Sequence, residues 1–174
     1  MWVDPEDDPR ETGTAFHGER DVVLGYLDFY RKTLELKCSG LDAEQMARRS
    51  VPPSTLSLLG LVRHLGAVEH SWFRRVLSEQ PELPRLFRSA EDRDLDFNGA
   101  VADDAVVMEA WEVWNREVAH AREVVDELDF GDTVPHHGEQ IEVRDVAVHM
   151  VEEYARHLGH ADLLRESIDG RTGQ

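Results

Sequence analysis

The sequence predicts an all-α protein built as an up-down-up-down four-helix bundle. Two observations carry this prediction. Four long segments repeat apolar residues every three or four positions, and no segment alternates convincingly between apolar and polar residues as a strand would. Helices that each have one apolar face bury it most economically against one another in an antiparallel bundle.

Length and charge restrict the classes of function. The 174 residues are expected to form an irregular lead-in (1–18), one bundle domain (19–170) and a short tail (171–174). The chain has 36 acidic against 19 basic side chains, which argues against a nucleic-acid partner. No uncharged run could span a bilayer, and residues 1–10 lack the apolar centre of a signal peptide. We therefore expect a cytoplasmic protein without a membrane partner.

Cys38 is the only cysteine, so no intrachain disulfide can form and a reducing compartment is expected. A nucleophilic thiol needs a neighbouring base and a polarising environment, and the adjacent residues supply only Lys37. We do not expect a catalytic role for Cys38.

The first half of the chain contains two predicted helices. One spans residues 19–38 and ends near Gly40, followed by a connector, 41–53, with a short helical turn at 43–49. The next is capped by Ser54 or Ser57 and continues to Leu77. Its apolar stripe consists of Leu58, Leu61, Leu65, Val68, Trp72 and Val76.

The second half begins with the longest irregular stretch, residues 79–102, which is expected to cover one end of the domain or to carry a short helix around 86–90. Asp103 is expected to cap a third helix that ends at Gly131, with Trp111 and Trp114 in the core or, alternatively, lining a cavity. A turn at residues 134–139 holds His136 and His137, which we interpret as solvated. A fourth helix, 142–168, contains no proline.

Glu153 and His157 are four residues apart and lie on one face of the fourth helix. They could form a surface pair or contribute two ligands to a divalent metal. A buried carboxylate requires a compensating metal, arginine or proton. His64 lies on the inward side of the second helix, which an up-down-up-down bundle would place parallel to the fourth, so the three side chains could meet.

Two stretches of the chain resemble the DinB-like superfamily: Val51-Pro52-Pro53-Ser54 with Leu61-Val62-Arg63-His64-Leu65, Val68, Glu69 and Trp72, and residues 153–170 with Glu153-Tyr154-Ala155-Arg156-His157-Leu158-Gly159-His160. Within the superfamily, the chain is most similar to a branch of small actinobacterial proteins related to mycothiol-dependent maleylpyruvate isomerase. Many members have His-x-x-x-His in the fourth helix. Glu153 at the first of these positions favours the isomerase branch.

The resemblance implies a DinB-like bundle with one divalent metal ion held by His64, Glu153 and His157. Zinc is favoured for this donor set, with nickel, iron and manganese as alternatives. It further implies a thiol transferase or isomerase that activates a low-molecular-weight thiol of the mycothiol type for transfer or addition to an electrophilic small molecule. A metal-dependent hydrolase, a non-enzymatic bundle with a stabilising metal, and a homodimer remain alternatives.

Three further residues near these ligands have open roles. His160 could support the ligands from behind or replace one of them. Arg156 and Arg165 could anchor a substrate carboxylate or could pair with nearby acids on the surface, and surface pairing is favoured. No residue is assigned as catalytic.

Overall fold

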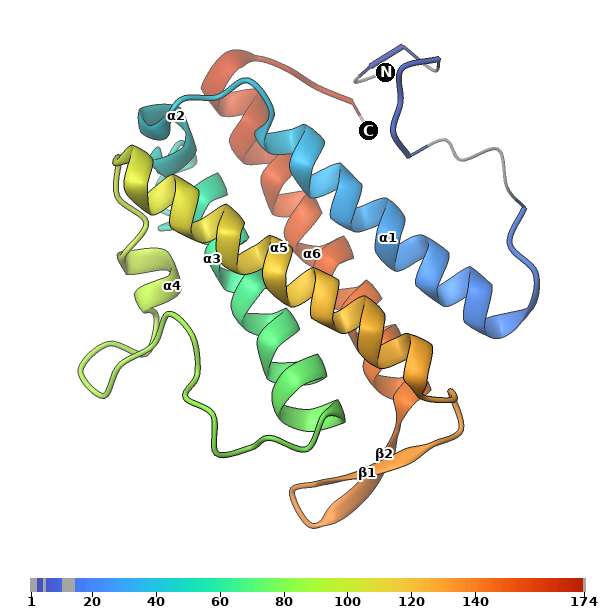
Figure 1. The fold of residues 1–174 in the computed structure, drawn as a ribbon. Helices are drawn as coiled ribbons and strands as arrows, with labels where there is room; N and C mark the ends of the chain where they lie inside the picture. Colours follow the sequence, from blue (N-terminus) through green and yellow to red (C-terminus); the bar gives the residue numbers. More distant parts are fainter. Residues whose placement is uncertain (1–2, 5, 11–14, 174) are drawn as a thin grey trace.

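The computed structural model describes residues 3–4, 6–10 and 15–173, most of them helical. Figure 1 shows four long helical segments lying side by side, which confirms the predicted all-α class. No helix in the described residues is long and apolar enough to cross a membrane. The elements in order are α1 (Gly18–Cys38), α2 (Ala43–Ala47), α3 (Leu58–Glu69), the π-helix η1 (His70–Leu77), α4 (Leu95–Asn98), α5 (Asp104–Glu127), β1 (Thr133–His136), β2 (Glu139–Glu142) and α6 (Val143–Asp169).

Side-chain caps begin two helices where the sequence predicts them. The Ser57 hydroxyl accepts the Gly60 N–H at 3.1 Å and begins α3, while the Asp103 carboxylate accepts the Ala105 N–H at 2.8 Å and begins α5. Gly170 ends α6 with a φ of 76°, in the left-handed region. α5 ends at Glu127, before the predicted end at Gly131.

The helices do not alternate in direction, so the up-down-up-down order is wrong. Later residues of α3–η1 contact later residues of α5, because Arg63 pairs with Glu109 and Arg74 pairs with Glu117. Ser78, directly after η1, continues this order by contacting His120. The same holds for α1 and α6: Glu19 with Arg144, and Lys37 with Asp162. Both pairs are therefore parallel, and the order is up-down-down-up.

The segment between Leu77 and Asp104 explains this order. It leaves the far end of η1 and returns along the bundle before α5 begins, as Figure 1 shows. The prediction assumed that each connection simply reverses the chain. A long crossover connection instead lets two consecutive helices run in the same direction. This crossover segment, residues 78–103, is called the crossover loop below.

Three local features differ from the expectations. The short helix of the crossover loop lies at Leu95–Asn98 and not at 86–90. The second long helix continues as η1, where backbone bonds reach five residues back, from the Ser78 N–H to the Phe73 carbonyl at 3.0 Å. The predicted turn belongs to a two-stranded antiparallel hairpin, β1–β2, with His137 and Gly138 at its tip in positive φ.

A buried polar network joins the four long helical segments. Arg31 of α1 makes two hydrogen bonds to the Glu69 carboxylate of α3, at 2.8 and 2.7 Å. The Tyr154 hydroxyl of α6 donates to Glu69 at 2.8 Å, and the Trp114 indole of α5 donates to Tyr154 at 2.8 Å. Glu69 is fully buried, and burial is the main cause that raises the pKa of Tyr154. Trp114 is therefore a core residue, as expected.

Candidate metal centre

Three side chains meet between α3 and α6. His64, Glu153 and His157 each offer one ligand atom, and these atoms all lie within 4.8 Å of one another. His157 Nε2 lies 3.4 Å from Glu153 Oε2, and the rings of His64 and His157 are 4.6 Å apart at their centroids. All three residues are half-buried. We call this group the His64–Glu153–His157 cluster.

The cluster follows from how α6 packs on α3. The two helices are antiparallel, because His64 meets His157 while Glu69, further along α3, meets Tyr154, earlier in α6. Glu153 and His157 occupy one face of α6 because they are four residues apart. The Tyr154–Glu69 hydrogen bond lies one residue from Glu153, so it holds this part of α6 against α3.

Asp96 of α4 orients His64, and the sequence did not single it out. Its carboxylate lies 2.8 Å from His64 Nδ1. A carboxylate can only accept here, so Nδ1 carries the proton and Nε2 keeps its lone pair for a ligand. A carboxylate behind a histidine is a common support for a metal ligand. Asp96 was hidden because the crossover loop contains several acids and no helical pattern marks one of them.

Two more histidines contact the cluster. His160 Nδ1 lies 3.4 Å from His157 Nδ1, so His160 contacts this candidate ligand. His149, also not singled out from the sequence, places Nε2 3.5 Å from Glu153 Oε1. A hydrogen bond from His157 is the main cause that holds the pKa of Glu153 below its usual range, although burial opposes it. Burial also lowers the pKa of His160.

The two arginines considered as substrate anchors have other partners. Arg156 is exposed and pairs with Glu152 at 3.0 Å, which is the favoured surface pairing. Arg165 is buried, where it donates to the carbonyls of Lys37 and Ser39 and pairs with Asp169. Arg165 thus connects the end of α1 to α6.

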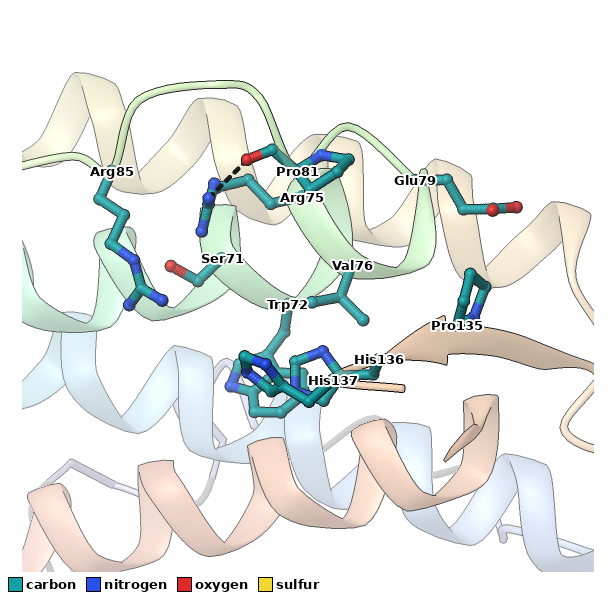
Figure 2. Close-up of a pocket in the computed structure, with 10 residues that line it drawn as sticks. All are labelled: Ser71, Trp72, Arg75, Val76, Glu79, Pro81, Arg85, Pro135, His136 and His137. Carbon is teal, nitrogen blue, oxygen red and sulfur yellow. Dashed lines mark hydrogen bonds between the residues drawn. The ribbon is translucent and has the colours of Figure 1, made fainter. Parts of the chain in front are cut away.

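A cavity of about 190 Å³ adjoins the cluster, and His64, Glu153 and Asp96 are among the residues that line it. It shares Ser71, Trp72 and Arg85 with a larger groove of about 460 Å³. The groove is drawn in Figure 2, where His136 and His137 lie beside Trp72, and the ring centroids of Trp72 and His136 are 5.3 Å apart. The interpretation of these histidines as merely solvated therefore missed their place in this groove.

The donor set suits a first-row divalent ion. Two imidazole nitrogens and one carboxylate oxygen are ligands of zinc, and equally of iron, nickel or manganese. The contact with Asp96 favours the tautomer of His64 that a ligand requires, and the neighbouring His157 favours the ionised form of Glu153. A small molecule in the adjoining cavity would lie directly beside this cluster, because His64 and Glu153 form part of the cavity wall.

Comparison with known proteins gives one match. A family model described as mycothiol-S-transferase matches residues 22–170, a span that includes the cluster, the crossover loop and all of the long helices except the start of α1. No curated protein and no solved structure matches the chain.

Proposed function

Because the chain belongs to the mycothiol-S-transferase family, we propose that it joins a low-molecular-weight thiol of the mycothiol type to an electrophilic small molecule. The proposal includes a divalent metal ion held by His64, Glu153 and His157. The observation that carries it is the convergence of these three ligand atoms within 4.8 Å, from two helices, beside a cavity.

Each part of the site has a role in this proposal. A bound divalent ion supplies Lewis acidity that favours the thiolate form of a thiol near neutral pH. Asp96 fixes the orientation of His64 through the Nδ1 hydrogen bond. His149 and His157 hold the Glu153 carboxylate from two sides, with contacts of 3.5 and 3.4 Å. The cavity between α3 and the crossover loop receives the electrophile.

The thiol must come from a second substrate. Cys38, the last residue of α1, is buried, and burial raises the pKa of its thiol to about 12. A thiol with such a pKa has almost no thiolate at neutral pH, and the thiolate is the nucleophile. The chain's own cysteine is therefore not part of the proposed reaction.

Metal content tests the centre itself. Protein purified without an affinity tag should contain close to one equivalent of a divalent metal by elemental analysis. His64→Ala and His157→Ala should each lose it, because the removal of one of three ligands weakens the site strongly. His120→Ala is the matched control, since His120 lies on α5 and contacts Ser78. Metal content unchanged in both cluster variants would overturn the centre.

Thiol consumption tests the reaction. Metal-replete protein is mixed with mycothiol, bacillithiol or glutathione and an alkyl halide. The sulfur forms a bond to carbon, the halide leaves with its bonding electron pair, and the thiol proton passes to solvent. We expect acceleration with at least one thiol and its loss in His157→Ala, but not in His120→Ala. Protein that is metal-replete yet inert with all three thiols would refute thiol transfer and turn attention to hydrolysis.

A further inference from the structure

We infer that Arg85, Arg88 and Arg93 form an anion subsite that selects electrophiles carrying a carboxylate. This inference rests on the proposed function, because it assigns the substrate class to the same site. The three arginines belong to the crossover loop, and all of them line the cavity that adjoins the His64–Glu153–His157 cluster. The subsite therefore faces the place where the reacting carbon of an electrophile would lie.

These arginines differ from most others in the chain, which have acidic or carbonyl partners. Arg63, for example, pairs with Glu109, and Arg74 pairs with Glu117. Within the part of the chain that the structure describes, the guanidinium groups of Arg85, Arg88 and Arg93 form no ion pair or hydrogen bond. All three residues are exposed, so their guanidinium groups are solvated and accessible to an anion that enters the cavity.

The crossover loop is held in place by other arginines. Arg63 donates to the Leu95 and Asp96 carbonyls, and its guanidinium lies 4.0 Å from the centroid of the Phe87 ring. Arg75 donates to the Pro81 and Leu83 carbonyls. Both ends of the segment that carries the three unpaired arginines are thus fixed to the second long helix. Figure 2 shows the Arg85 guanidinium turned toward Ser71.

The charges around the cavity favour an anion. Its ionisable lining consists of three arginines, two carboxylates and one histidine, and Asp96 and Glu153 are both engaged with histidines. A divalent ion in the cluster would add further positive charge. Guanidinium groups match the planar geometry of a carboxylate and can bind both of its oxygens. The subsite therefore suits a small carboxylate better than a neutral molecule of the same size.

A matched pair of alkylating agents tests this selection. Iodoacetate and iodoacetamide present the same carbon and the same leaving group and differ in charge. With saturating mycothiol, the enzymatic rate divided by the uncatalysed rate should be at least roughly fivefold larger for iodoacetate, since ion pairs of this kind contribute modest energies each. Arg88→Gln with Arg93→Gln should remove that preference through a higher KM for iodoacetate, with a much smaller change in the kinetics with iodoacetamide.

The control double variant is Arg48→Gln with Arg49→Gln. It also removes two positive charges, from a surface at α2 that belongs to another cavity. It should keep the preference for iodoacetate. An equal acceleration of both agents by the wild type, or an unchanged preference in the Arg88/Arg93 variant, would overturn the anion subsite. Absence of acceleration with either agent would refute the proposed function instead.

Calorimetric titration with succinate provides a readout without turnover. The wild type should bind this dicarboxylate, the Arg88/Arg93 variant should bind it at least roughly fivefold more weakly, and the affinity should fall as salt is added. The wild type and the Arg88/Arg93 variant both retain the cluster, so succinate bound only to the metal would have the same affinity for the two proteins. Equal affinity in the wild type and the Arg88/Arg93 variant, or no binding by the wild type, would overturn the inference even if the transferase reaction were inactive.

Discussion

Asp96 decides which nitrogen of His64 faces the cluster. Its carboxylate accepts the Nδ1 proton at 2.8 Å, so its removal would free the ring to rotate and to change tautomer. We expect Asp96→Ala to weaken metal affinity by roughly 10–100-fold, the usual effect of losing such a support. Competition with a chromophoric chelator measures this. Asp94→Ala, an exposed neighbour, should retain wild-type affinity; equal affinity in the two variants would contradict the role of Asp96.

His70 links stability to pH. Burial lowers its pKa, with Glu117 opposing and Arg74, Arg75 and Arg116 adding to the effect, and its Nδ1 atom has no hydrogen-bond partner among the described residues. The unfolded chain therefore binds the proton more readily. The contribution of His70 to stability is complete above a pH of about 6.5 and is lost as the pH falls toward the lower, folded pKa.

The variant His70→Gln isolates this contribution. Urea unfolding at about pH 7.5 and about pH 5.5 should show a smaller loss of stability on acidification in the variant than in the wild type, by on the order of 1 kcal/mol or less. Carboxylates titrate in both proteins and cancel in the comparison. An identical loss in both proteins would show that His70 does not titrate across this range in a way that depends on folding.

At the scale of elements, two glycines offer opposite tests. Gly159 lies within α6, and a Cβ atom there would meet nothing within 4 Å. Gly138 lies at the tip of the β1–β2 hairpin with a φ of 87°. Gly159→Ala should raise the free energy of unfolding by about 0.5–1 kcal/mol, because alanine favours the helix. Gly138→Ala should lower it by about 1 kcal/mol, because a Cβ is strained at positive φ.

Chemical denaturation measures both changes, and each glycine variant serves as the control for the other. Metal content should stay the same in both, since neither residue contacts the cluster ligands in the described structure. A fall in stability for Gly159→Ala would mean that the exposed face of α6 is covered by something outside the described residues, such as a second copy of the chain.

The long helices were predictable from sequence, and the shorter elements were not. A stripe such as Leu58, Leu61 and Leu65 identifies a helix because burial of that stripe stabilises it. The same stripe continues through η1, and its apolar spacing does not distinguish a π-helix from an α-helix. β1 contains Pro135 and has only four residues, so no alternation could emerge. The helix α4 also has only four residues and is held by contacts with Arg63 rather than by its own pattern.

At the scale of the whole molecule, the buried network makes the four long helical segments interdependent. Glu69 compensates the buried charge of Arg31 and accepts a hydrogen bond from Tyr154. Glu69→Ala would leave Arg31 buried without its partner, so we expect a loss of about 3–5 kcal/mol in unfolding free energy. Tyr154→Phe removes the hydrogen bond donated to Glu69 and the one accepted from Trp114, and should cost about 1–3 kcal/mol.

Urea denaturation checks these two values, and Glu109→Ala is the control. Glu109 also pairs with an arginine, Arg63, but it is largely exposed, so its loss should change stability by less than about 1 kcal/mol. Similar losses of unfolding free energy for Glu69→Ala and Glu109→Ala would show that the buried network stabilises the fold no more than an exposed ion pair does.

The relative directions of the helices could not be predicted from the sequence. An amphipathic stripe shows which side of a helix is buried, but it is nearly the same for either direction of the chain. The cluster was predicted although the assumed direction was wrong, because its prediction required only that the second and fourth long helices be neighbours. Asp96 and the three loop arginines were not predicted, because the path of the crossover loop places them.

The candidate metal ligands and the loop arginines lie on different parts of the fold, and this separation affects how substrate preference can change. His64, Glu153 and His157 lie on helices whose positions the Arg31–Glu69–Tyr154–Trp114 network holds, whereas Arg85, Arg88 and Arg93 lie on the crossover loop, outside that network. Substitutions in the loop can therefore alter substrate preference at little cost to folding. The stretch of this loop that carries the three arginines, residues 85–93, is a natural segment to randomise when a new specificity is sought, whereas Asp96 is best retained because it orients His64.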